Sequence, residues 1–138
     1  MRRVVVTGIG IVSSIGSNAA EVEASLREGR SGVRHAPDYA EHGFRCQVHG
    51  QPTVDLDALI DKRQRRFMGD GAAYNYVAME QAIADSGLEP DEVSHERTGL
   101  IVGSGGPSTK NMLSAHLTVL EKKSPKRMGP FMVTRCMS

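Results

Sequence analysis

Residues 3–16 have the sequence Arg3-Val4-Val5-Val6-Thr7-Gly8-Ile9-Gly10-Ile11-Val12-Ser13-Ser14-Ile15-Gly16. The β-branched run at 4–7 has no polar alternation and ends at a glycine, which is typical of a strand buried on both faces of a parallel sheet. A second such run, at 98–102, also ends at a glycine-rich loop. Because helical patterns lie between the two runs, the sequence predicts an α/β fold.

A helix is predicted directly after the first glycine-rich stretch. Asn18, with Glu21 three residues on, has the pattern of a capping box. Val22 and Leu26 form the expected buried stripe, and Gly29 is a typical helix stop. The N-terminal region should therefore read strand, loop, helix.

The remaining chain divides into an irregular part and a helical part. Residues 31–55 carry several turn residues around a short possible strand at 46–49. A short helix is predicted at 55–60 and a long one at 66–86, where apolar residues recur at helical spacing before a glycine. Another helix is expected after the loop at 103–107.

The composition is that of a soluble globular protein. A length of 138 residues fits about one domain. With 17 basic against 16 acidic residues the net charge is +1, which favours no particular partner. The two cysteines cannot form a dense disulfide framework, and no apolar run reaches the length of a signal or membrane-spanning segment. We therefore expect a cytoplasmic protein.

The glycine loops do not match nucleotide-binding fingerprints. The Gly8-x-Gly10 pair has Ser13 where a dinucleotide site has its third glycine. The acidic residue expected to hold a ribose is Glu28, which falls near the end of the predicted helix. The loop at 103–106 lacks the Lys-Ser/Thr pair of a phosphate-binding loop. Close packing of strand and loop is the preferred explanation for Gly8 and Gly10, and the loop at 103–106 is expected to let another group pass close to its backbone.

The sequence offers no convincing nucleophile or metal site. Cys136 lies two residues from the end of the chain, so no following residues could supply an oxyanion hole. Cys46 and His49 have poor metal spacing without a second pair. We assign no catalytic and no metal-binding residue to this chain.

Two basic clusters stand out, Lys62–Arg66 and Lys122–Arg127. The first occurs at the predicted start of the long helix, where cations oppose the helix dipole and so do not serve helix stability. An anionic partner would explain such placement. A merely solvated charged face is the alternative, and both remain open at this point.

The ordered set of motifs resembles the opening of the β-ketoacyl-acyl-carrier-protein synthases, most of all the bacterial synthase I branch, with synthase II as its neighbour. The resemblance rests on residues 3–16 and continues, in order and spacing, over nearly the whole chain. The later matching segments are 25–33, 66–68, 79–87, 99–106 and 129–131.

The resemblance implies a thiolase-like fold, layered α-β-α-β-α in the complete enzyme, and a cytoplasmic homodimer. Residues 1–138 would be the N-terminal part of the N-terminal domain. The implied reaction is decarboxylative condensation of an acyl-enzyme with malonyl-acyl-carrier-protein in fatty-acid elongation, without a metal or redox cofactor. Because the family's catalytic cysteine, histidines and lysine follow in later segments, we expect this chain alone to be inactive.

The resemblance also implies binding roles. Gly106 matches the floor of an acyl pocket, and its rival reading is a turn glycine. The segment that crosses the dimer interface and walls the pocket corresponds to Met132, Cys136 and Met137, with ordinary core packing as the alternative. The basic rim where acidic acyl carrier protein docks corresponds to Lys62, Arg63, Arg66, Lys123, Lys126 and Arg127.

The sequence allows two alternative functions to be compared with this one. A chain-length-factor-like or non-catalytic carrier-binding relative would share these motifs. Nucleic-acid binding is disfavoured because the net charge is only +1 and aromatic residues make up 4% of the chain, which leaves no stacking platform. No membrane partner is expected.

Overall fold

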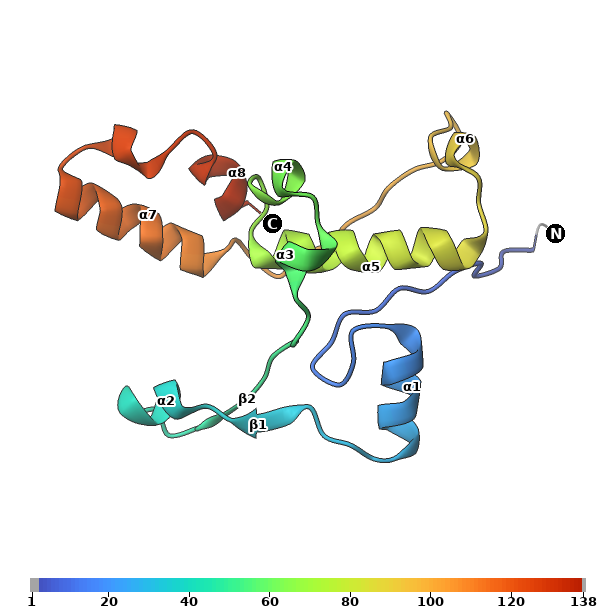
Figure 1. Cartoon of the computed structure of the whole chain (residues 1–138), viewed down its shortest axis with the longest axis horizontal. Coiled ribbons are helices and arrows are strands. Elements are labelled where there is room, and N and C mark those ends of the chain that lie inside the picture. Colours follow the sequence, from blue (N-terminus) through green and yellow to red (C-terminus); the bar gives the residue numbers. More distant parts are fainter. Residues whose placement is uncertain (1–2, 138) are drawn as a thin grey trace. The chain divides into compact units, whose positions relative to one another are not determined.

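The computed structural model describes residues 3–137 (Figure 1). Met1, Arg2 and Ser138, at the ends of the predicted domain range, lie outside the described residues. The chain forms two compact units, here called unit 1 and unit 2. Unit 1 comprises Met1–Val54 with Ala78–Leu88, and unit 2 comprises Asp55–Val77 with Glu89–Ser138.

Unit 1 contains the predicted capped helix, α1 (Ala19–Arg27). The Asn18 side chain accepts a hydrogen bond from the Glu21 backbone N–H at 2.9 Å, and the Glu21 carboxylate accepts one from the Ser17 N–H at 2.8 Å. The N-cap and the helix are confirmed, whereas the reciprocal bond of a capping box goes to the Ser17 N–H and not to that of Asn18. The predicted buried stripe is wrong at Leu26, which is 68% exposed, while Ser25 is buried and donates to the Ile15 carbonyl.

The N-terminal segment of unit 1 lies against the last turns of α5 (Asp70–Ser86) rather than in a sheet. The Ile9 N–H donates to Asp85 at 2.9 Å and the Ile11 N–H donates to Gln81 at 3.0 Å. A Cβ atom at Gly10 would collide with the Ala78 carbonyl group of that helix. Gly8 and Gly10 thus serve close packing, as predicted, whereas a Cβ atom at Gly103, Gly105 or Gly106 would meet no heavy atom within 4 Å.

A small hairpin completes unit 1. Strands β1 (Val33–His35) and β2 (Val48–Gly50) pair antiparallel, with Arg34 opposite His49. The helix α2 (Pro37–Glu41) occupies the connection between the strands. The predicted short strand at 46–49 corresponds to β2, but its partner strand β1 and helix α2 were not predicted.

Unit 2 is built from helices. Asp55 caps the short helix predicted at 55–60, and Ser108 caps the helix predicted after the glycine loop, so both predictions are confirmed. The elements are α3 (Leu56–Leu59), α4 (Lys62–Arg65), the start of α5, α6 (Pro90–Val93), α7 (Thr109–Lys122), the 3-10 helix η1 (Pro125–Met128) and α8 (Met132–Cys136).

The long helix begins at Asp70, four residues later than predicted. The cluster Lys62–Arg66 instead forms the separate helix α4 and its C-cap. The first turn of α5 therefore carries an acidic side chain, which suits the helix dipole. The expectation that cations oppose the dipole of the long helix is wrong, and the partner inference loses that support.

The two predicted buried strands are also absent from the part of the chain that the structure describes. Residues 4–7 and 98–102 have no regular secondary structure and belong to no described strand. Val4 is 95% and Ile101 is 97% exposed. A strand needs a hydrogen-bonded neighbour, and the described sheet holds only β1 and β2. The secondary structure is a mixture of helix and sheet, in keeping with the predicted α/β class.

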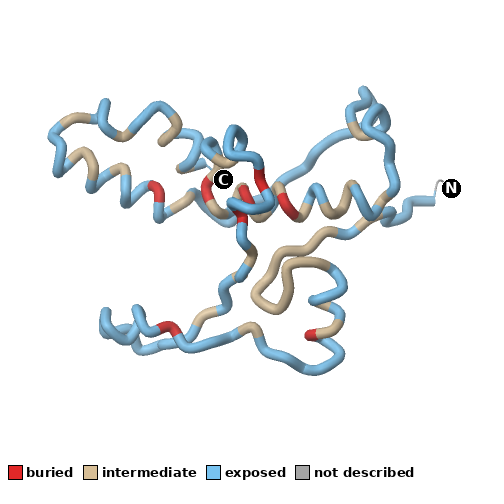
Figure 2. The backbone as a smooth tube through the Cα atoms, viewed as in Figure 1, coloured by how far each residue is buried: buried red, intermediate tan, exposed pale blue. Residues whose placement is uncertain are grey.

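Few side chains are buried in either unit (Figure 2). In unit 2 the buried apolar residues are Leu56 of α3, Ile60 directly after it, and Ala73 and Val77 in the first half of α5. No helix among the described residues is long and apolar enough to cross a membrane.

Candidate functional site

An apolar cavity of about 640 Å³ lies in unit 2. All four residues assigned from the sequence to an acyl pocket line this one cavity, namely Gly106, Met132, Cys136 and Met137. Their partners in the lining are Pro107, Met112, Ala115, Met128, Gly129 and Val133. The wall is therefore rich in thioether side chains, which adapt readily to ligands of different shape.

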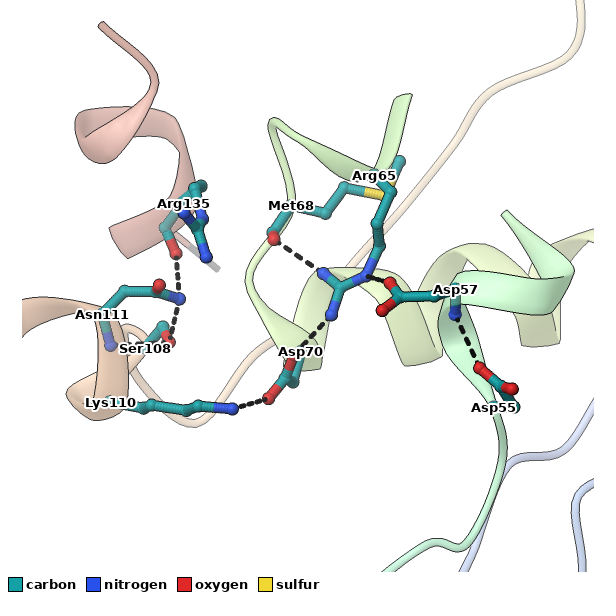
Figure 3. A network of polar contacts seen from close by, with 9 residues as sticks. All are labelled: Asp55, Asp57, Arg65, Met68, Asp70, Ser108, Lys110, Asn111 and Arg135. Carbon is teal, nitrogen blue, oxygen red and sulfur yellow. Dashed lines mark hydrogen bonds and ion pairs between the residues drawn. The ribbon is translucent and has the colours of Figure 1, made fainter. Parts of the chain in front are cut away.

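Polar contacts join the N-terminal end of α7 to the end of α8, two elements that contribute residues to the cavity wall (Figure 3). The Ser108 N–H donates to the Cys136 carbonyl at 3.0 Å. The buried Asn111 amide donates to the Arg135 carbonyl at 3.2 Å and to the Ser108 hydroxyl at 2.8 Å. Gly69 permits this closure, because a Cβ atom there would lie 2.7 Å from the Arg135 carbonyl oxygen.

Gly106 faces open space. A Cβ atom at this position would have no heavy atom within 4 Å, and the residue does not have positive φ. The turn-glycine alternative therefore gains no support from backbone strain. A larger side chain at this position can be accommodated by the backbone.

Sequence reasoning missed several wall residues, above all Met112 and Met128. Met112 and Ala115 are one helical turn apart on α7, and Met128 ends η1. Helical spacing from the capped start of α7 could have placed Met112 and Ala115 on one face. The position of Met128 depends on the packing of η1 against α7, which no local pattern predicts.

The first basic cluster has three exposed cations, Lys62, Arg63 and Arg66. The guanidinium carbon of Arg66 lies 4.7 Å from the Phe67 ring centre and 4.9 Å from that of Phe131. The two rings meet edge to face at 4.7 Å. Stacking of this kind orders a guanidinium while leaving its donors free.

The second basic cluster follows α7. Lys123 is the C-cap of this helix and has a positive φ of 50°. Lys126 and Arg127 belong to η1, and all three side chains are exposed. The helix η1 packs against α7. The cations predicted to dock the carrier are thus solvent-accessible in both clusters.

Arg65, between the exposed cations of α4, has a different environment. Its side chain is 21% exposed and forms ion pairs with Asp70 at 2.7 Å and Asp57 at 3.1 Å. Lys110 of α7 also contacts Asp70, at 3.2 Å. The Arg65 hydrogen bond, aided by Lys110, holds the pKa of the Asp70 carboxyl below its usual value, against the opposing effect of burial.

Both cysteines are free thiols. Within residues 3–137 no three His, Cys, Asp or Glu side chains come together in a way that could hold a metal ion. The apolar cavity and the exposed cations are therefore the features of the described residues that suit binding.

The profile of the family described as "Beta-ketoacyl synthase, N-terminal domain" matches residues 1–138. The chain belongs to this family. One curated relative is the "3-oxoacyl-[acyl-carrier-protein] synthase 1" of Haemophilus influenzae, which is 46% identical over 138 residues. The alignment covers 100% of this chain and 34% of the relative, so the chain spans about a third of its length. The predicted likeness to the synthase I branch is confirmed.

Solved structures confirm the predicted thiolase-like fold class. The chain superimposes on "The ishigamide ketosynthase/chain length factor" with a TM-score of 0.80 and 28% identity, covering 96% of this chain and 33% of the other. A β-ketoacyl synthase from Burkholderia phymatum STM815 gives a TM-score of 0.78 and 33% identity, covering 99% and 34%.

Proposed function

We propose that this chain supplies the N-terminal part of a condensing enzyme that performs decarboxylative condensation in fatty-acid elongation. The observation that carries the proposal is the 46% identity to a synthase 1 over 138 residues, the full length of the chain. In the proposed reaction an acyl group is first held as a cysteine thioester. Malonyl-carrier then loses CO2, and the resulting carbanion attacks the thioester carbonyl and releases the thiolate.

None of the residues in this chain is assigned to bond making or breaking. Its proposed contribution is binding, in two places. The cavity at Gly106 and the α8 methionines takes the acyl chain, because an apolar wall removes the chain from water at about 0.8 kcal/mol per methylene. The homodimer is part of the proposal, with the segment from Met132 to Met137 at its interface.

The exposed cations are proposed to dock the acyl carrier protein. Clustered positive charge steers an acidic partner and sets its orientation more than it adds raw affinity. Lys62, Arg63 and Arg66 form one cluster, and Lys123, Lys126 and Arg127 form the other. Arg66 is distinguished among them by a guanidinium that lies over the rings of Phe67 and Phe131.

The first test is the intact mass of the natural polypeptide. A mass about three times the 14.9 kDa of this chain is expected for a complete synthase. The complete enzyme should elongate acyl thioesters, and the 138-residue chain alone should not. A natural polypeptide of 14.9 kDa would overturn the condensing-enzyme proposal and leave a non-catalytic carrier-binding protein.

Charge reversal tests the docking surface. In the complete enzyme, Lys62→Glu with Arg63→Glu should raise KM for acyl-carrier substrates about tenfold or more, because repulsion replaces attraction at both positions. Turnover of a carrier-free acyl thioester should hardly change. An equal loss on both substrates would show that the variant damages the fold or the chemistry and not docking.

A chain-length-factor-like relative is the alternative function. The named similarity to a ketosynthase/chain length factor structure makes it a specific rival. Such a protein would bind a catalytic partner and would form no acyl-enzyme itself. Mass spectrometry after incubation with an acyl thioester separates the two, since only the condensing enzyme gains the mass of the acyl group.

A further inference from the structure

Helix α4 is too short to hold its own direction. It spans Lys62–Arg65, and a single helical turn is unstable in water without outside contacts. One anchor is local, since the Asp61 carboxylate accepts a hydrogen bond from the Arg63 N–H at 2.8 Å. The direction of the helix must come from contacts with other elements.

Arg65 makes those contacts in both directions along the chain (Figure 3). Its guanidinium bonds Asp57 of α3, before the helix, and Asp70 at the start of α5, after it. It also donates to the Met68 carbonyl at 2.8 Å and so closes the turn between α4 and α5. One planar, five-donor head group therefore joins three helices, a task that suits arginine and not lysine.

The neighbouring cations of the cluster differ from Arg65 in their exposure. The Arg65 side chain is 21% exposed, and it contributes to the floor of a hollow of about 300 Å³ with Asp57, Ile60, Lys62 and Arg66. Lys62 and Arg66 are separated by one helical turn and share a face, and both are exposed. The cluster therefore contains one partly buried cation, Arg65, and three exposed cations.

We propose that Arg65 is a positioning residue whose ion pairs with Asp57 and Asp70 fix α4 so that Lys62, Arg63 and Arg66 meet the partner in one arrangement. This inference rests on the proposed carrier docking. It assigns Arg65 no contact with the carrier. Lys110 of α7 also pairs with Asp70, but its side chain is 82% exposed, so this ion pair contributes little and the cavity wall does not depend on it.

Positioning and simple charge attraction make opposite predictions for Asp70→Asn. Loss of a carboxylate beside a basic surface should strengthen the attraction for an acidic carrier and lower its KM. Loss of the anchor should raise KM by roughly twofold to tenfold, because a long side chain that is no longer held must be ordered on binding. The turnover of a carrier-free thioester should stay unchanged in both cases.

The experiment compares four variants of the complete enzyme by KM for acyl-carrier and kcat on a carrier-free thioester. We expect Asp70→Asn and Arg65→Lys to raise KM for the carrier, although Arg65→Lys keeps the charge. Glu121→Gln is the matched control, because it removes an exposed carboxylate beside the second cluster and should leave KM equal or lower. Lys62→Glu with Arg63→Glu tests docking itself.

Each outcome decides the inference. Raised KM for both anchor variants, with unchanged kcat on the carrier-free thioester, supports it. If charge reversal raises KM while the anchor variants do not, positioning by Arg65 is overturned and docking stands. If charge reversal has no effect, docking and the inference fall together. A poorly folded variant is recognised by loss on both substrates, and Arg65→Gln with Asp70→Asn then repeats the test without an unpaired charge.

Discussion

The depth of the apolar cavity should set the length of the acyl chain that the enzyme accepts. Gly106 is the point of attack, because its side-chain position is open and its backbone needs no positive φ. Alanine and leucine can therefore be introduced there without a predicted change of backbone. Each added carbon occupies space that the last carbons of a long chain would otherwise use.

The size of the effect follows from burial. One excluded methylene costs about 0.8 kcal/mol, which is roughly fourfold in kcat/KM. Gly106→Ala should therefore reduce the kcat/KM for the longest accepted chain about fourfold. Gly106→Leu adds four carbons, and the expected loss is about 3 kcal/mol, or two orders of magnitude. Short chains that do not reach the cavity floor should be elongated as before.

The assay is kcat/KM across a series of acyl thioesters that differ by two carbons, read together with the product-length profile. Gly103→Ala is the matched control, since it lies in the same loop, has the same free space and does not line the cavity. A uniform loss across all lengths, or an unchanged profile in Gly106→Leu, would refute the placement of Gly106 in the pocket.

Three further predictions concern stability. Gly10→Ala should destabilise the protein by roughly 1–3 kcal/mol in urea unfolding, because its Cβ atom would collide with the Ala78 carbonyl group, whereas Gly71→Ala, in open space on α5, should be neutral or stabilising. The folded-state pKa of Asp70 is depressed below 3.8, so its stabilisation is present above that pH and is lost as the pH falls through the folded value. Asp70→Asn should flatten the acid limb of urea midpoint against pH, and an unaltered slope would contradict this. Lys123→Gly should stabilise the protein by about 1 kcal/mol by relieving a left-handed backbone, and calorimetry checks the sign.

Local signals predicted local structure well. Asn18 caps its helix as predicted, and Asp55 and Ser108 cap the helices predicted at their positions. These signals work because a cap and its helix lie within a few residues of each other. The predicted start of the long helix was wrong because Asp61 caps a separate short helix, which precedes the start of α5 at Asp70.

The pairing of strands that are distant in the sequence could not be predicted. The apolar runs at 4–7 and 98–102 have strand composition, yet strand formation depends on neighbours that composition does not identify. In the described structure the backbone of Ile9 and Ile11 is satisfied by side chains of α5 instead. The strand propensity of a segment does not identify the segment that would pair with it.

The candidate site shows the same division. The family motifs selected Gly106, Met132, Cys136 and Met137, and the structure brings these four residues to one cavity. The sequence carried no signal for the internal role of Arg65, because nothing local distinguishes one cation in a basic run from the others. Only the ion pairs with Asp57 and Asp70 separate it from Arg66.

Four thioethers, those of Met112, Met128, Met132 and Met137, line a single cavity. Peroxide adds one oxygen to such a sulfur and releases water, and the sulfoxide is polar where the thioether was apolar. A wall that adapts to chains of many lengths is for that reason sensitive to oxidants. Oxidised protein should first lose its longest substrates, and reduction of the sulfoxides should restore them.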